Sequence, residues 1–112
     1  MLYSYLGEVL EVKNLHISAL LDVYGFFLSE KQRLITEHYY NDDLSLGEIA
    51  ENEGITRQGV SDLIKRAEAQ LIAFEERCHY CERFSSLKEL AEAVRNGDVS
   101  KTEELLDIID IL

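Results

Sequence analysis

The fold is decided by the stretch LSLGEIAENEGITRQGVSDLIKRA, residues 44–67. Ser45 is followed three residues later by Glu48, and this spacing is the pattern of a capping box, which predicts that a short helix begins here. Gly54 can adopt the left-handed backbone conformation of a tight turn, and Thr56 is placed to cap the next helix. The stretch therefore predicts two helices joined by a tight turn, a helix-turn-helix.

Small and apolar residues stand where the two helices of this motif cross. Ala50 is small enough for close approach of the helices, and Ile55 closes the turn. Val60 and Ile64 would hold the second helix at a fixed angle to the first. This geometry projects the outward residues at the start of the second helix into a nucleic-acid groove. The candidate nucleic-acid-binding residues are Arg57, Gln58, Ser61, Asp62, Lys65 and Arg66.

These candidates divide by chemistry. Arg57 and Gln58 can form bidentate hydrogen bonds with guanine or adenine edges, whereas Lys65 and Arg66 stand where a phosphate would lie. Asp62 would repel phosphate, although its carboxylate could accept a hydrogen bond from a cytosine amino group.

The rest of the chain predicts an all-α protein. It has no Pro and six Gly among 112 residues, and its apolar residues recur every three or four positions. We expect three parts: an N-terminal helical segment at 1–28, a helix-turn-helix domain with an extended recognition helix at 29–84, and a C-terminal helical hairpin at 85–112.

Before the motif, an apolar face at helical spacing is expected to run through Leu15, Ala19, Val23, Phe26 and Phe27 as far as Leu28. Ser29 is then a good N-cap for a helix that ends near Asn41. The recognition helix has no stop signal and is expected to continue to about Cys78.

Two further capping boxes are expected in the tail, and Asn96 and Gly97 should end the helix between them. The boxes pair Ser85 and Ser86 with Glu89, and Ser100 with Glu103. The last helix is so apolar that it must dock on its own domain or on another chain, which makes a homo-oligomer the expected state. The expected interface residues are Leu105, Ile108, Ile109 and Leu112.

Charge limits how the protein can bind nucleic acid. The chain has 22 acidic and 11 basic residues, a net charge of −11. Residues 29–68 alone carry five basic and nine acidic side chains. This excludes a protein that coats nucleic acid with positive charge, and affinity for bulk DNA should be weak. Several subunits presenting their motifs together, or a partner with a cationic surface, would compensate.

Other function classes find little support. The chain has no P-loop, no nucleophile elbow and no paired carboxylates in an identifiable cleft, so we expect a non-enzyme without cofactors. Cys78 and Cys81 form a single C-x-x-C pair, and without a second pair no metal site is expected. No apolar run is long enough to cross a bilayer and no signal peptide is evident, which predicts a cytoplasmic protein without a membrane span.

Two groups of side chains allow a structural or a functional interpretation. Tyr39 and Tyr40 could stack on RNA bases, but aromatic residues at a helix end more often pack on the core. The acidic residues Glu75, Glu76 and Glu82 are most simply a solvated helix face, with contact to a basic partner as the alternative.

Three blocks in order, LSEKQ at 28–32, YYNDDLSLGEIA at 39–50 and TRQGVSDLIKR at 56–66, carry a resemblance. The motif is similar to the helix-turn-helix of sigma factor region 4, and the wider span resembles the YlxM-like family of small bacterial proteins. The resemblance implies an all-helical, non-enzymatic protein that acts with the bacterial signal recognition particle by contacting its RNA, its GTPase or both. The alternatives are a DNA-binding transcriptional regulator and a structural adaptor that uses its acidic helical surface.

Overall fold

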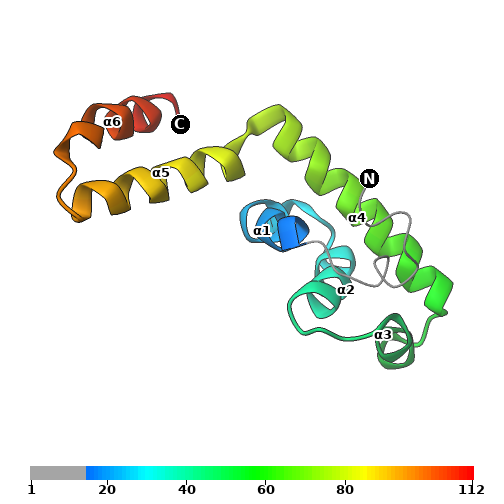
Figure 1. Ribbon diagram of the computed structural model, residues 1–112. Coiled ribbons are helices and arrows are strands. Elements are labelled where there is room, and N and C mark those ends of the chain that lie inside the picture. Colours follow the sequence, from blue (N-terminus) through cyan, green and yellow to red (C-terminus); the bar gives the residue numbers. More distant parts are fainter. Residues whose placement is uncertain (1–14) are drawn as a thin grey trace, which may run out of the picture. The chain divides into compact units, whose positions relative to one another are not determined.

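The computed structural model describes residues 15–112, and every regular element in that range is helical. The predicted all-α fold is confirmed. The first half of the expected segment 1–28 lies outside the described residues. The α-helices, labelled in Figure 1, are α1 (Leu15–Tyr24), α2 (Glu30–Tyr40), α3 (Leu46–Glu53), α4 (Arg57–Cys78), α5 (Tyr80–Arg95) and α6 (Thr102–Ile111). Two 3-10 turns lie between them, η3 (Gly25–Phe27) and η4 (Val99–Lys101).

The chain forms two compact units. The first ends at Ala73 and contains α1, α2, α3 and most of α4. The second is Phe74–Leu112, with the last turn of α4, the helices α5 and α6, and η4.

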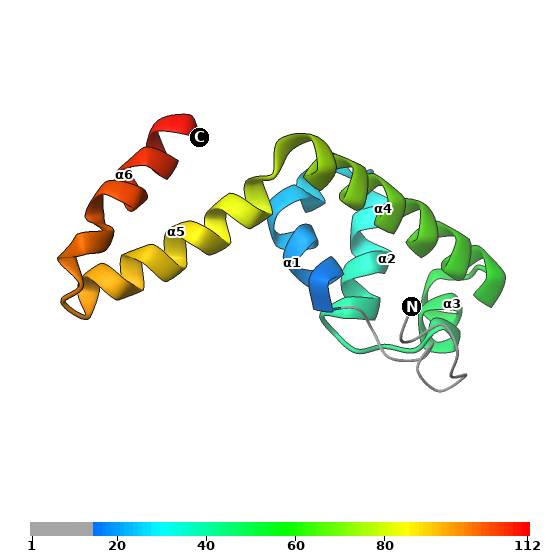
Figure 2. The ribbon, with the colours of Figure 1, turned by 45° about the horizontal axis from the view of Figure 1, so that its top comes forward.

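The core of the first unit lies where its helices meet α4. Figures 1 and 2 both show α1, α2 and α3 on one side of α4, with α3 near the start of α4 and α1 toward its later turns. Ile35 of α2, Ile49 of α3 and Val60 of α4 are each fully buried in one cluster. This cluster joins the two helices of the predicted motif to α2, and it holds α4 by packing on one face only.

The buried face of α1 differs from the expected one. Its buried residues recur at i, i+3, i+4 and i+7, and they are Ile17, Leu20, Leu21 and Tyr24. The prediction is wrong for Ala19, which is exposed on α1, and for Phe26 and Phe27, which are 67% and 59% exposed because α1 gives way to a 3-10 turn at Gly25. Leu28, where the expected face ends, is buried.

The predicted starts of the two central helices are confirmed. Ser45 Oγ accepts from the backbone N–H of Glu48 while the Glu48 carboxylate accepts from the N–H of Ser45, and these two bonds form the capping box. Ser29 forms the same reciprocal pair with Gln32 at the start of α2. Such boxes satisfy backbone donors that a helix end leaves free, which explains why these helices begin where they do.

The end of α2 is tied to α4 by side chains distant in sequence. The hydroxyl of Tyr40 donates a short hydrogen bond to the carboxylate of Glu68. The ring of Tyr40 meets that of Tyr39 edge to face at 5.0 Å, and both residues pack against the core cluster. The packing interpretation of these tyrosines therefore holds, with both side chains half-buried.

The second unit is a helical hairpin in which α6 packs on α5. The two capping boxes expected in it are absent. Ser85 and Ser86 lie within α5, which has already begun at Tyr80, and α6 begins at Thr102 without a side-chain cap. The expected end of α5 is confirmed, since Asn96 caps it and Gly97 follows at φ +101°.

A carboxylate outside the expected pattern starts α5. The two oxygens of Glu75 accept from the backbone N–H groups of Cys81 and Glu82, each at 3.0 Å. His79, at the N-cap position, is left-handed and makes no side-chain cap bond. The Glu75 carboxylate therefore accepts from the backbone N–H groups that an N-cap side chain usually satisfies. Glu75 is thus a capping residue rather than part of a solvated acidic face.

Candidate nucleic-acid interface

The turn of the motif has the geometry its sequence predicts. Gly54 adopts φ +69° and ψ +31°, the left-handed conformation, and its N–H donates to the carbonyl of Ala50. The N–H of Ile55 reaches the same carbonyl at 3.1 Å. On the far side of the turn, Thr56 Oγ1 accepts from the N–H of Gly59 at 2.9 Å and starts α4. Both helices are therefore anchored to the turn by hydrogen bonds.

The first turns of α4 divide cleanly into an inner and an outer side. Val60, Ile64 and Ala67 are buried. Between them, the candidate residues lie away from the core: Ser61 is half-buried, and the exposed ones are Arg57, Gln58, Asp62, Lys65 and Arg66. The structure thus brings all six predicted residues to the outer surface of one helix.

Two of the candidate residues form a hydrogen bond with each other. Gln58 Nε2 donates to Asp62 Oδ1 at 2.9 Å across one helical turn. This bond orients the Gln58 amide along the helix, and it occupies one of the carboxylate oxygens that could accept from a base.

Arg57 lies against a residue that the sequence reasoning did not single out. A Cβ placed on Gly47 of α3 would sit 3.8 Å from Arg57 Nε. This is an ordinary van der Waals distance, so Arg57 lies beside the first turn of α3 but does not require a glycine there.

The cations of this surface are not neutralised. Within residues 15–112, Arg57, Lys65 and Arg66 form no ion pair with a carboxylate. Arg33 of α2, by contrast, is bound to Glu37, with Nε 3.3 Å from Oε2. The start of α4 consequently presents three uncommitted positive charges on a molecule that is acidic overall.

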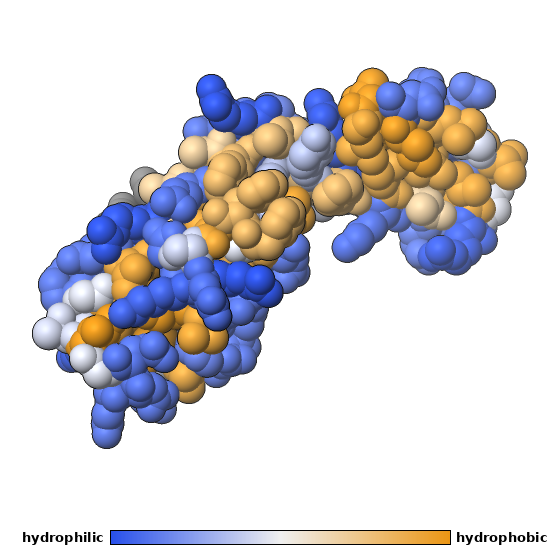
Figure 3. Space-filling view, turned by 180° about the vertical axis from the view of Figure 1, so that it is seen from behind, coloured by the Kyte–Doolittle hydropathy of each residue, from blue (hydrophilic) through white to orange (hydrophobic). Residues whose placement is uncertain are grey.

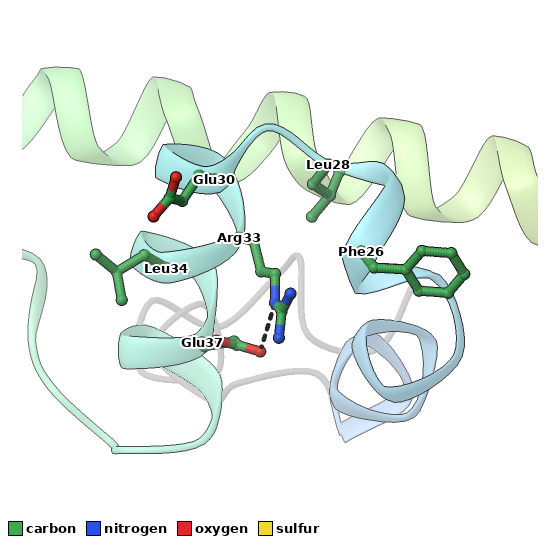
Figure 4. Close-up of a pocket in the computed structure, with 6 residues that line it drawn as sticks. All are labelled: Phe26, Leu28, Glu30, Arg33, Leu34 and Glu37. Atoms are coloured by element: carbon green, nitrogen blue, oxygen red, sulfur yellow. Dashed lines mark hydrogen bonds and ion pairs between the residues drawn. The ribbon is translucent and has the colours of Figure 1, made fainter.

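A separate groove of about 520 Å³ lies beside α2 and has a different character. Figure 4 shows Phe26 and Leu34 at its two sides and the Arg33–Glu37 ion pair between them. Since Glu30 adds a second carboxylate, the charged groups of the groove sum to −1. A phosphate would be repelled there, and we do not count this groove as part of the nucleic-acid interface.

Cys78 and Cys81 are both half-buried free thiols. Among the described residues, no group of three or more His, Cys, Asp or Glu side chains is placed to hold a metal ion. No helix in the described range is long and apolar enough to cross a membrane.

Comparison with known proteins agrees with this geometry. Residues 11–110 match the model of the UPF0122 family, whose description reads "Putative helix-turn-helix protein, YlxM / p13 like". The chain is 43% identical over 101 residues to a UPF0122 protein of Clostridium kluyveri, covering 87% of this chain and 91% of that one. It is 41% identical over 105 residues to UPF0122 protein ABC2295 of Shouchella clausii, covering 89% and 96%. A relative from Halalkalibacterium halodurans, UPF0122 protein BH2485, is 42% identical over 104 residues, covering 89% and 94%.

Proposed function

Because the chain belongs to the UPF0122 family of YlxM- and p13-like helix-turn-helix proteins, we propose that it is a non-enzymatic nucleic-acid-binding protein that uses the outer side of α4. The observation that carries the proposal is the set of three uncommitted cations, Arg57, Lys65 and Arg66, on the helix that the motif projects outward.

The proposal assigns separate tasks along α4. Lys65 and Arg66 contact phosphates and fix the register, while Arg57 and Gln58 at the first turn reach base edges. With two phosphate-contacting cations per copy, electrostatic affinity is small: the logarithm of affinity should fall with the logarithm of salt at a slope of about −1.8 for duplex DNA. Binding by one copy is therefore weak, as the overall charge of −11 also demands.

Two nucleic-acid targets are in question, and different observations favour them. The resemblance to YlxM-like proteins favours the RNA of the signal recognition particle, and in that case the protein regulates the particle through its RNA or its GTPase. The helix-turn-helix geometry favours duplex DNA, because a helix fits the major groove of B-DNA and not the deep, narrow major groove of duplex RNA. In that case the protein is a transcriptional regulator of the cell's own promoters, and both alternatives place it in the cytoplasm.

Salt-titrated fluorescence anisotropy tests the proposal, comparing signal recognition particle RNA with random-sequence duplex DNA. The double variant Arg57→Ala/Lys65→Ala should flatten the salt slope on DNA by about 0.9, because Lys65 is the phosphate-contacting member of the pair, and the loss of Arg57 should weaken binding further. The matched control, Lys31→Ala/Arg33→Ala, removes the same charge from two exposed side chains of α2 and should leave the slope near that of the parent.

The outcomes separate the alternatives. Preference for the RNA supports a role in the signal recognition particle pathway, and preference for duplex DNA supports a regulator. Equal loss of binding in the test and control variants would mean that only overall charge matters, and no binding at low salt would point to a protein adaptor; either result overturns the proposal.

A further inference from the structure

The break between α4 and α5 falls where the sequence has no helix breaker. Residues 74–86 read FEERCHYCERFSS and contain neither Gly nor Pro. The helix α4 nevertheless ends at Cys78 and α5 begins at Tyr80, and the residue between them, His79, adopts φ +57° and ψ +23°. This left-handed conformation is unfavourable for a residue other than glycine, so contacts of the folded chain must hold it.

Helical hydrogen bonding reaches His79 from both sides. Its N–H donates to the carbonyl of Glu75 at 2.8 Å, and its carbonyl accepts from the N–H of Arg83 at 3.0 Å. Both bonds join residues four apart, as in an α-helix. The interruption therefore concerns only the donors of residues 80–82, which in a continuous helix would reach the carbonyls of residues 76–78.

One side chain takes two of these three donors. Oε1 of Glu75 accepts from the N–H of Cys81 and Oε2 accepts from the N–H of Glu82, each at 3.0 Å. In a continuous helix the same two N–H groups would donate to the carbonyls of Arg77 and Cys78. The carboxylate of Glu75 and these backbone carbonyls therefore compete for the same donors.

Packing within the second unit does not fix the break. None of the residues from 74 to 112 is buried, and Figure 3 shows hydrophobic side chains of α5 and α6 on the surface. Nδ1 of His79 lies 3.5 Å from Oε2 of Glu82, but both side chains are more than half exposed, and such a pair contributes little. We therefore assign the break to the two hydrogen bonds of Glu75.

We propose that residues 75–82, which we call the joint, form a two-state element controlled by Glu75. With the carboxylate on the donors of α5, the chain turns at His79 and the two helices are separate. When the carboxylate is withdrawn, His79 becomes right-handed and the last turn of α4 continues into α5 as one helix. The change exchanges two side-chain hydrogen bonds for backbone ones and removes one left-handed residue, so the two states are close in free energy.

Nuclear magnetic resonance of the full chain distinguishes the two states. In a continuous helix the α proton of one residue lies near the amide proton of the residue three positions later. Cross-peaks from Arg77 to Tyr80 and from Cys78 to Cys81 therefore report the joined state. The parent should lack both, and the coupling constant of His79 should report a left-handed φ.

Two kinds of variant shift the joint. Glu75→Ala removes both acceptor oxygens, and both cross-peaks should appear. The matched control, Glu76→Ala, removes the same charge from an exposed neighbour and should keep the pattern of the parent. His79→Ala disfavours the left-handed state and His79→Gly favours it, so the ratio of joined to separate helices should be at least about fivefold higher in the alanine variant.

The outcomes decide the proposal. A parent that already shows both cross-peaks overturns it, and so does a folded Glu75→Ala variant that keeps the break or loses the helix of residues 80–86 without joining it to α4. Equal shifts in Glu75→Ala and Glu76→Ala would assign the effect to charge alone, which also overturns it. If Glu75→Ala does not fold, the two His79 variants carry the test, and an equal ratio in both refutes the joint. None of these measurements involves nucleic acid, so they are independent of the proposed function.

Discussion

Changing Asp62 to Asn should strengthen nucleic-acid binding. Asp62 is the one acidic residue among the outward candidates of α4, and its Oδ1 accepts from Gln58 Nε2 at 2.9 Å. Asparagine keeps a carbonyl oxygen for that bond and removes the charge, so the local helix structure should be unchanged.

The size of the gain follows from helix geometry. Lys65 lies three residues beyond Asp62, so their Cβ atoms are about 5–6 Å apart, and a phosphate bound by Lys65 would be about 7 Å from the Asp62 carboxylate. At that distance two unit charges repel by about 0.6 kcal/mol in water and about 1.2 kcal/mol at half its dielectric constant. These energies correspond to a gain of about three- to sevenfold at low salt, which should shrink as salt is added.

Anisotropy titrations at two salt concentrations measure the effect. Asp22→Asn removes the same charge from an exposed residue of α1 and should change affinity much less. A loss of affinity confined to one base-pair position would mean that Asp62 accepts from a cytosine instead. Unchanged affinity for every sequence would refute the placement of α4 against phosphates.

Three changes in the first unit should alter stability, each measured by thermal and denaturant unfolding. Thr36 is fully buried and its Oγ1 has no hydrogen-bond partner among residues 15–112, so Thr36→Val should raise the free energy of unfolding by about 1 kcal/mol and the Tm by roughly 4 °C. A loss of stability would show that the hydroxyl is satisfied. Gly54→Ala should lower the free energy of unfolding by about 1 kcal/mol because of the left-handed conformation, although no atom lies within 4 Å of the new Cβ; equal stability would mean that the turn can relax. Ser45→Ala should cost about 1 kcal/mol through loss of the capping box, whereas Ser45→Asp should cost little; equal losses in both would argue against the cap.

The sequence predicted the helix-turn-helix well because its constraints are local. The caps at Ser29 and Ser45, the left-handed Gly54 and the start of α4 each depend on residues within three or four positions, and each is confirmed. The outward placement of the six candidates follows from the same helical period.

The errors arose where two local patterns competed. In α1, two sets of apolar residues both fit a helical face, and only packing against the other helices decided that Ile17 and Leu20 turn inward. In the tail, Ser85 and Ser86 followed by Glu89 fit the pattern of a capping box. The helix α5 nevertheless begins upstream of them, where Glu75 caps its first turn. That bond joins the last turn of one helix to the first turn of the next, and no capping rule contains it.

The hydrogen bond from Tyr40 to Glu68 should lower the fluorescence of Tyr40, so tyrosine emission can report on the structure of the first unit. The chain has no tryptophan, so its intrinsic fluorescence comes from six tyrosines. An excited phenol that donates a hydrogen bond to a carboxylate transfers its proton to it, and this quenches the fluorescence of the phenol. The fluorescence of Tyr40 should therefore be quenched while α2 is held against α4. Tyrosine emission should rise when the contact between α2 and α4 opens, so this opening can be followed without a fluorescent label.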